Sequence, residues 1–228
     1  MISRLRGLGI VLGLIGIVFV AAGAFAFMKT QEGYKSLNAF SAAQGVQLTY
    51  NDKGQLVSGD TKEAAAIMTL LTKDWGYPVA TSDLNPNDPI VNTASEYMFQ
   101  MATIAYHTLH STVTVVLTEP VAYKGKTYAA GSYDVPIAGR YFSQLDRSDP
   151  LQGPARTQAW SALAHGLIGE LGVGTATASA LQLALAMAGL LAGLGATLIL
   201  TGAGLVWATR PETHPVPVPV LRPATLQA

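Results

Sequence analysis

GLGIVLGLIGIVFVAAGAFAF, residues 7–27, contains no charged side chain, and neither does LQLALAMAGLLAGLGATLILTGAGLVW, residues 181–207. Each run exceeds the roughly 20 residues that a helix needs to cross about 30 Å of hydrocarbon. We therefore expect transmembrane helices at residues 7–27 and 181–208. Residues 28–180, which lie between them, are left to form one small domain and to carry any activity.

The composition limits what this chain can do. Only 12% of its 228 residues are charged, against about 25% in soluble domains. The formal net charge is +0, so no basic field favours nucleic acid and we expect no such partner. The absence of cysteine excludes disulfides, thiol nucleophiles and cysteine-ligated metal clusters.

Arginines at the ends of the two apolar runs predict the topology. Arg4 and Arg6 precede the first run, and Arg210 and Arg222 follow the second. Positive residues close to a membrane segment tend to stay in the cytoplasm. Residues 1–6 and 209–228 are therefore predicted to be cytoplasmic, and residues 28–180 extracytoplasmic, in a multi-pass protein of the plasma membrane with a hairpin topology.

A signal peptide is the alternative for the first run. Ala24-Phe25-Ala26 resembles a cleavage site, and the basic start is typical of a secretory signal. The apolar run is longer than the roughly 7–15 residues of a secretory core, which favours an uncleaved anchor. Either interpretation leaves the central domain extracytoplasmic.

Both apolar runs carry small residues at helical spacing, namely Gly9, Gly13 and Gly16 in the first and Gly189 and Gly193 in the second. Such spacing lets helices approach closely in lipid, so we expect these glycines to pair the two helices or to dock a partner's helix. The general abundance of glycine in membrane helices explains them equally well. Neither run holds an ionisable residue, which argues against a proton relay or a transporter core.

The central residues predict a small α+β domain. The first helix continues to about Gly45, and capping residues open two further helices: Asp60 for 61–73, and a Thr93/Glu96 capping box for 94–110. Turn residues and alternating apolar residues predict strands over 46–50, 55–57, 113–117 and 126–135, with Lys124-Gly125 as a turn.

Residues 157–171 are predicted to form a juxtamembrane amphipathic helix, because Trp160, Leu163, Leu167 and Leu171 share one helical face. We expect it to lie on the bilayer; packing against the domain is the alternative. Residues 172–174, Gly-Val-Gly, suggest a flexible joint. The cytoplasmic tail, 209–228, is proline-rich and predicts either disorder or a ligand for a proline-binding module.

The best polar constellation lies on the helix that follows Thr93. Glu96, Gln100, Thr103 and His107 form a stripe, and His110 lies one turn beyond His107. Histidine and carboxylate are ligands for zinc or iron, so His107, His110 and Glu96 are weak metal candidates that still need further ligands. A solvated helix face is the simpler interpretation.

Signals for catalysis are otherwise missing from the sequence. It has no P-loop, G-x-S-x-G, H-E-x-x-H or G-x-G-x-x-G motif, so we assign no catalytic residue, expect no cofactor and do not favour an enzyme. Asp146, Arg147 and Asp149 are expected to form local ion pairs. His165 and Glu170, close to the second apolar run, are candidates for touching a lipid head group or a quinone.

The run Tyr141 to Pro150, YFSQLDRSDP, resembles a known family. It is similar to the actinobacterial two-helix membrane proteins of unknown function that are often labelled "aromatic ring-opening dioxygenase", which carry a Leu-Asp-Arg-x-Asp-Pro pattern before their second membrane helix. Leu145, Asp146, Arg147, Asp149 and Pro150 match that pattern. Asp88-Pro89, followed by a helix ending in histidine, matches a second one.

This resemblance implies a membrane hairpin with an external domain and no established activity. The chain departs from the family between Pro150 and Leu181, where a Phe-Leu-Arg-Ala-Ser run is missing. The dioxygenase label does not carry over, because no ligand triad is evident.

Three hypotheses follow. The first is an accessory or structural protein of the cell envelope whose domain interacts with another integral membrane protein or complex. The second is a module that binds a lipid, quinone or small aromatic ligand near the bilayer, and the third is a metal-dependent enzyme that uses His107 and His110. A further ligand close to both imidazoles favours the enzyme, an apolar pocket beside Trp160 favours the binding module, and a flat surface favours the accessory protein.

Overall fold

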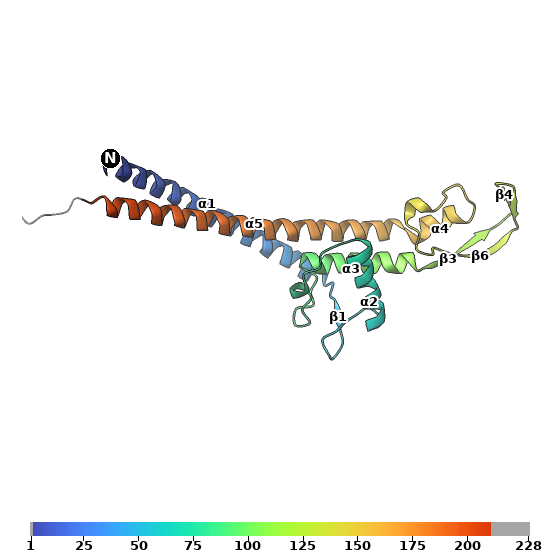
Figure 1. Cartoon of the computed structure of the whole chain (residues 1–228). Coiled ribbons are helices and arrows are strands. Elements are labelled where there is room, and N and C mark those ends of the chain that lie inside the picture. The colour runs from blue at the N-terminus through green and yellow to red at the C-terminus, as the bar shows by residue number, and fades with distance from the viewer. Residues whose placement is uncertain (1, 211–228) are drawn as a thin grey trace, which may run out of the picture. The chain divides into compact units, whose positions relative to one another are not determined.

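The computed structural model describes residues 2–210, so the predicted proline-rich segment from Pro211 onward lies outside the described residues. The described residues form two compact units, residues 2–27 with 186–210, and Met28–Leu185. Two long helices, α1 (Ile2–Gln44) and α5 (Ala162–Ala208), each contribute to both units (Figure 1).

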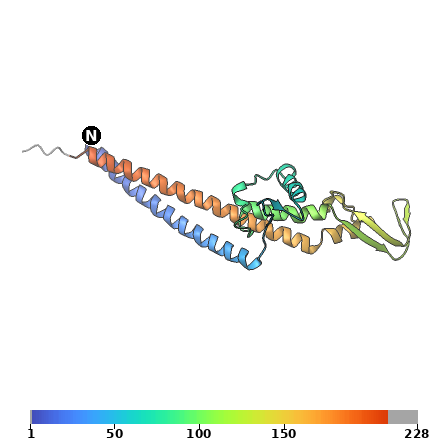
Figure 2. The same cartoon turned by 90° about the horizontal axis from the view of Figure 1, so that it is seen from below.

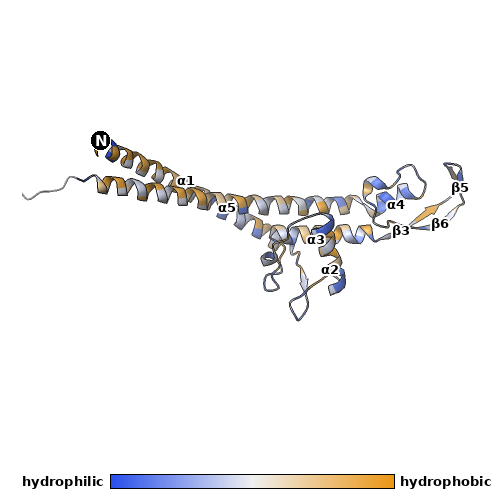
Figure 3. Cartoon of the chain, in the orientation of Figure 1, coloured by the Kyte–Doolittle hydropathy of each residue, from blue (hydrophilic) through white to orange (hydrophobic). Residues whose placement is uncertain are grey.

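The first unit consists of the apolar ends of α1 and α5, which lie side by side and antiparallel (Figures 1 and 2). Their most apolar 18-residue windows have mean hydropathies of 2.7 and 2.2, and only 11% of each window is buried within the chain. Figure 3 shows these ends mostly in the hydrophobic colour. Both helices are therefore long and apolar enough to span a membrane.

The second unit is the predicted α+β region. Its helices, besides the inner ends of α1 and α5, are α2 (Thr61–Thr69), α3 (Ala94–Leu109) and α4 (Gln152–Ala159), with short turns η1 (Leu70–Asp74), η2 (Thr81–Asp83) and η3 (Phe142–Gln144). Its strands are β1 (Thr49–Tyr50), β2 (Leu56–Val57), β3 (Thr112–Leu117), β4 (Val121–Tyr123), β5 (Lys126–Tyr128) and β6 (Gly131–Pro136).

Local capping signals place α2 and α3 where the sequence predicts them. Glu63 N donates to Asp60 Oδ1 over 2.7 Å at the start of α2. The Thr93/Glu96 capping box opens α3 with both of its hydrogen bonds formed. Each bond satisfies a donor that a helix start would otherwise leave unpaired. The helix predicted to reach Lys73 ends earlier as α2, and its last turn widens into the π-helical η1.

The strand predicted over 126–135 is divided in two. β5 pairs with β4 across the Lys124-Gly125 turn, whereas β6 pairs with β3, Val113 opposite Val135. Pro120 stands in the gap between β3 and β4, where its missing N–H removes a ladder bond. Within the described residues the strands form three separate antiparallel pairs, β1–β2, β3–β6 and β4–β5.

The predicted helix over 157–171 is also divided, so the expectation of one separate juxtamembrane helix is wrong. α4 ends at Ala159 and α5 begins at Ala162. Trp160 leaves the helical conformation and is only 6% exposed, and its Nε1 donates to the Arg140 carbonyl. Ser161 Oγ accepts a hydrogen bond from Ala164 N and thereby caps α5. Trp160 therefore packs in the domain, which was the alternative interpretation.

Two apolar clusters form the core of this unit. In the first, α3 packs along α2 and the inner ends of α1 and α5, with Ile67, Leu71, Phe99 and Ala102 almost fully buried. The second joins β3, β6 and α4 around Val115, Ile137 and Trp160. The first cluster positions Tyr97, which lines a pocket between α1 and α5.

Candidate functional site

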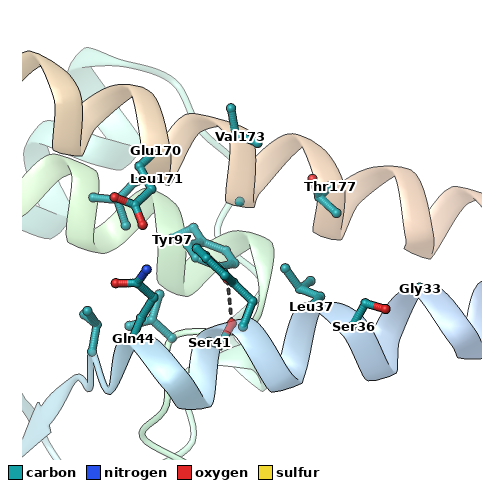
Figure 4. Close-up of a pocket in the computed structure, with 14 residues that line it drawn as sticks. Gly33, Ser36, Leu37, Ser41, Gln44, Tyr97, Glu170, Leu171, Val173 and Thr177 are labelled. Carbon is teal, nitrogen blue, oxygen red and sulfur yellow. Dashed lines mark hydrogen bonds between the residues drawn. The ribbon is translucent and has the colours of Figure 1, made fainter.

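An apolar pocket of about 590 Å³ lies between the inner ends of α1 and α5, which we call the interhelical pocket. Its lining comes from α1 (Gly33, Ser36, Leu37, Phe40, Ser41, Gln44), α5 (Glu170, Leu171, Val173, Gly174, Thr177), Tyr97 of α3, and Val46 and Val91. Figure 4 shows the two long helices as its side walls and Tyr97 between them. All of these residues belong to Met28–Leu185.

Tyr97 forms one wall because α5 has a glycine opposite it. A Cβ built on Gly174 would stand 2.6 Å from Cδ1 and Cε1 of the Tyr97 ring, closer than any side chain allows. On the other side, Ser41 Oγ of α1 and Tyr97 Oη share a buried hydrogen bond of 2.7 Å, which Figure 4 draws as a dashed line. One side chain of α3 thus connects both walls.

Each polar side chain that lines this pocket is hydrogen-bonded or exposed, and Thr177 is one of the exposed ones. The Ser41 and Tyr97 hydroxyls satisfy each other, and Ser36 Oγ donates to the Glu32 carbonyl. The side chains of Gln44 and Glu170 point toward one another at one end of the pocket (Figure 4). The interior that remains is lined by carbon, so it favours an apolar guest.

Apolar side chains at the pocket are also open to solvent. Phe40 is 50% exposed and Val173 is 68% exposed, and both line the pocket. Neighbouring exposed apolar residues around a hollow mark a binding surface more often than scattered single residues do.

A second hollow, of about 480 Å³, lies beside Trp160. We call it the aromatic pocket; it is lined by Trp75, Met101, Ala105, Tyr141, Phe142, Ser143, Trp160, His165 and Ile168. An apolar pocket beside Trp160 is the feature expected of a ligand-binding module. His165 lines this hollow, whereas Glu170 lines the interhelical pocket.

The polar stripe on α3 is solvated only in part: His107 is exposed, whereas Glu96 is buried. Glu96 is 1% exposed, and its Oε2 accepts from Asn92 N, Thr93 N and Thr93 Oγ1. Burial raises the pKa of this carboxyl above its ordinary value, against the opposing effect of those hydrogen bonds. The simpler interpretation was therefore wrong for Glu96, whose role is to cap α3 from inside the domain.

The three weak metal candidates do not converge. His107 Nδ1 lies 3.3 Å from Glu63 Oε1, and His110 Nδ1 hydrogen-bonds the Tyr106 carbonyl over 2.8 Å. Glu96 lies eleven residues before His107 on α3, roughly 16 Å along the helix axis. Across residues 2–210, no group of three or more histidine, aspartate or glutamate side chains is placed to hold a metal ion.

The family-like motif shapes the turn that leads into α4. Leu145 is buried in the second core cluster. Asp146 Oδ2 accepts from Tyr123 Oη at 2.7 Å and Lys124 Nζ at 2.9 Å, and these bonds hold its pKa well below the usual range. The expected local ion pair with Arg147 is therefore wrong, because Asp146 pairs instead with Lys124, 22 residues earlier in the chain.

The other residues of that motif fix the backbone of the turn at the start of α4. Asp149 Oδ1 accepts from the Leu151 and Gln152 amides, both at 2.9 Å, while Pro150 lies between the aspartate and these donors. A Cβ on Gly153 would stand 2.6 Å from the Arg147 carbonyl oxygen. The motif therefore has a structural role in this chain.

Not all of the predicted helix-packing glycines lie where α1 and α5 touch. Gly9 meets Gly202, Gly16 meets Gly195, and the Gly13 backbone lies beside Gly202. A Cβ on Gly189 or Gly193 would have no neighbour within 4 Å, so these two lie off the contact. Gly189 and Gly193 therefore do not pair α5 with α1, and their alternative role of docking a partner's helix stays a prediction.

A seven-residue period is the signal that finds the right set. Gly9, Gly16 and Gly23 recur every seven residues on α1, and Ala188, Gly195 and Gly202 do so on α5. A Cβ built on Gly23 would stand 2.9 Å from the Ala188 carbonyl oxygen. A strict heptad of small residues keeps one seam in contact along both helices.

Two further interactions were missed by sequence reasoning. Residues 172–174 are not a joint but part of the continuous α5, and Gly174 provides room for Tyr97. The Ser41–Tyr97 hydrogen bond joins residues 56 positions apart, which no local pattern reveals.

Comparison of this chain with protein-family models, with curated proteins and with solved structures finds no match. The resemblance to the two-helix membrane family therefore stays a prediction.

Proposed function

We propose that this chain is an integral protein of the plasma membrane, with α1 and α5 each crossing the bilayer once and Met28–Leu185 outside the cytoplasm. The uncovered apolar faces of both helices support insertion, since helices this apolar are otherwise buried in a core. Arg4, Arg6 and Arg210 support cytoplasmic ends.

The lack of cysteine makes this topology testable. A Thr127→Cys variant places the one thiol of the chain on exposed β5. A membrane-impermeant maleimide should label it in intact spheroplasts, whereas a cysteine in place of Ser3 should react only after lysis. Labelling of Ser3→Cys but not Thr127→Cys in intact cells would invert the topology.

Within that frame, we propose that the domain holds the acyl chain of a lipid in the interhelical pocket. Its volume of about 590 Å³ falls in the roughly 300–1,000 Å³ range of ligand sites. The observation that carries the proposal is the chemistry of the pocket: mostly apolar side chains line it, and the buried Ser41 and Tyr97 hydroxyls pair with each other. Its other polar side chains, Ser36, Gln44, Glu170 and Thr177, are exposed.

The bilayer is the natural source of such a guest. The walls are the continuations of the two helices that we place in lipid, and the pocket begins at Gly33, six residues after the apolar run ends at Phe27. The rim pair Gln44 and Glu170 offers hydrogen-bonding groups to the polar end of the lipid.

A photoactivatable fatty acid, incorporated into phospholipids of the native membrane, tests this role. Irradiation should cross-link it to peptides containing residues 33–46 and 170–177. Ser36→Trp fills the pocket from an exposed position and should abolish those cross-links, and Asn38→Trp, exposed on α1 but not in the lining, should retain them. Equal cross-linking in both variants would contradict acyl binding.

A second candidate role is that of an accessory protein which docks onto a larger membrane complex. The β3–β6 ribbon favours it, because each strand has one partner among the described residues and Val116 is 65% exposed. Unpaired strand edges readily accept another strand. Copurification in mild detergent should then yield a stoichiometric complex that Val116→Asp disrupts; a monomer in both proteins would exclude this role.

A further inference from the structure

We propose that the aromatic pocket is a second, separate ligand site, and that it binds a small planar ring carrying a hydroxyl group, such as a phenol. The pocket and the interhelical pocket share no lining residue. Four of the residues that line it are the aromatic Trp75, Tyr141, Phe142 and Trp160. Aromatic walls favour an aromatic guest through edge-to-face and stacked contacts.

Hydrogen bonds and stacking hold these rings in place before any ligand arrives. Trp75 Nε1 donates to Tyr141 Oη over 2.8 Å, and Trp160 Nε1 donates to the Arg140 carbonyl over 3.2 Å. The Tyr141 and Trp160 rings stack with centroids 5.7 Å apart. With both indole donors occupied, these walls offer a guest mainly apolar ring surface.

The charges around the pocket exclude an amine. Arg156 Cζ lies 3.7 Å from the centroid of the Phe142 ring, and none of the lining residues is acidic. Aromatic cages that bind quaternary ammonium ions attract the cation with ring faces, but here a guanidinium already occupies one face of Phe142. A neutral guest is therefore favoured.

His165 supplies the polar recognition. Its Nδ1 lies 3.1 Å from the Ser161 carbonyl oxygen, which can only accept, so Nδ1 carries the proton of the neutral ring. Nε2 is then left as an acceptor. Its ring lies edge-on to Phe142, with centroids 5.1 Å apart. A hydroxyl on the bound ring matches this acceptor, whereas a methyl ether does not.

Calorimetry with a matched ligand pair tests the site in the full-length protein held in nanodiscs. 4-Hydroxybenzamide should bind about tenfold more tightly than 4-methoxybenzamide, the factor expected for one net hydrogen bond. His165→Phe keeps an aromatic side chain but removes the acceptor, so it should abolish that preference. Equal affinities in the wild type, or no binding of either ligand at millimolar concentration, would overturn the proposal.

A blocking variant locates the binding. Ser143→Trp, at an exposed lining position on η3, should abolish binding of both compounds, and Ser148→Trp, exposed outside the lining, should leave it unchanged. Unchanged binding in Ser143→Trp would overturn the site. This assay does not depend on lipid in the interhelical pocket, so its failure would leave the cross-linking result intact.

Discussion

Gly174 of α5 lies against the ring of Tyr97 of α3. The contact leaves no room for a side chain, because a Cβ built on Gly174 would be 2.6 Å from two ring carbons. This contact sets how closely α3 approaches α5, and it makes Tyr97 a wall of the interhelical pocket. Its neighbour Gly172 has no such constraint, since its nearest contact would be Met101 Cε at 3.5 Å.

The two glycines should therefore respond differently to alanine. Gly174→Ala should destabilise the domain by about 1–3 kcal/mol, because an added methyl forces packed atoms apart. Gly172→Ala should be neutral or stabilising by up to about 1 kcal/mol, as alanine favours helix. Thermal unfolding followed by circular dichroism measures both, and equal effects would mean that Tyr97 does not press on Gly174.

Removing the Tyr97 hydroxyl should leave Ser41 unpaired in a buried position. We expect Tyr97→Phe to cost about 1–3 kcal/mol of unfolding free energy, the penalty for an unsatisfied buried polar group. The double variant with Ser41→Ala should recover most of this loss, since both polar atoms are then gone. Additive losses in the double-mutant cycle would show that the bond is not formed.

Glu96 should make stability depend on pH. Burial raises its pKa, so the folded state holds the proton more tightly than the unfolded state, and stability should fall as pH rises from about 4.5, the ordinary value, through the raised pKa. Glu96→Gln keeps an acceptor oxygen for the α3 cap but cannot ionise. In this variant the unfolding free energy should change less with pH over that range. An identical change with pH in both proteins would mean that another group causes it.

The heptad seam predicts which membrane glycines tolerate a large residue. Gly195→Leu should destabilise the α1–α5 contact by roughly 1–3 kcal/mol, because a Cβ there already meets the Gly16 carbonyl at 2.6 Å. Gly193→Leu, with no neighbour within 4 Å, should be tolerated. Thermal stability in detergent distinguishes them, and similar melting temperatures would argue against this seam.

Local features of the fold could be predicted from the sequence. Asp60 and the Thr93/Glu96 box cap helices through bonds to residues three positions away. The Lys124-Gly125 turn is formed by the positive φ angles of these two residues, 49° and 77°. Such signals are contained within a few residues, so a single sequence is enough to find them.

Features that depend on distant residues could not be predicted. Glu96 looked like part of a solvated stripe because the helix pattern does not tell which polar residue turns inward. The Gly174–Tyr97 contact and both pockets arise where separate segments meet. The sequence contains the small-residue heptad, but the four-residue glycine spacing predicted Gly189 and Gly193 as the helix-packing residues instead.

Native mass spectrometry of the protein released from native membranes tests the central claim most directly, that the interhelical pocket holds a lipid chain. The wild type and Asn38→Trp should each retain one lipid after the detergent is stripped, and Ser36→Trp should retain none. Wild-type protein without bound lipid, or equal retention in Ser36→Trp, would contradict the claim.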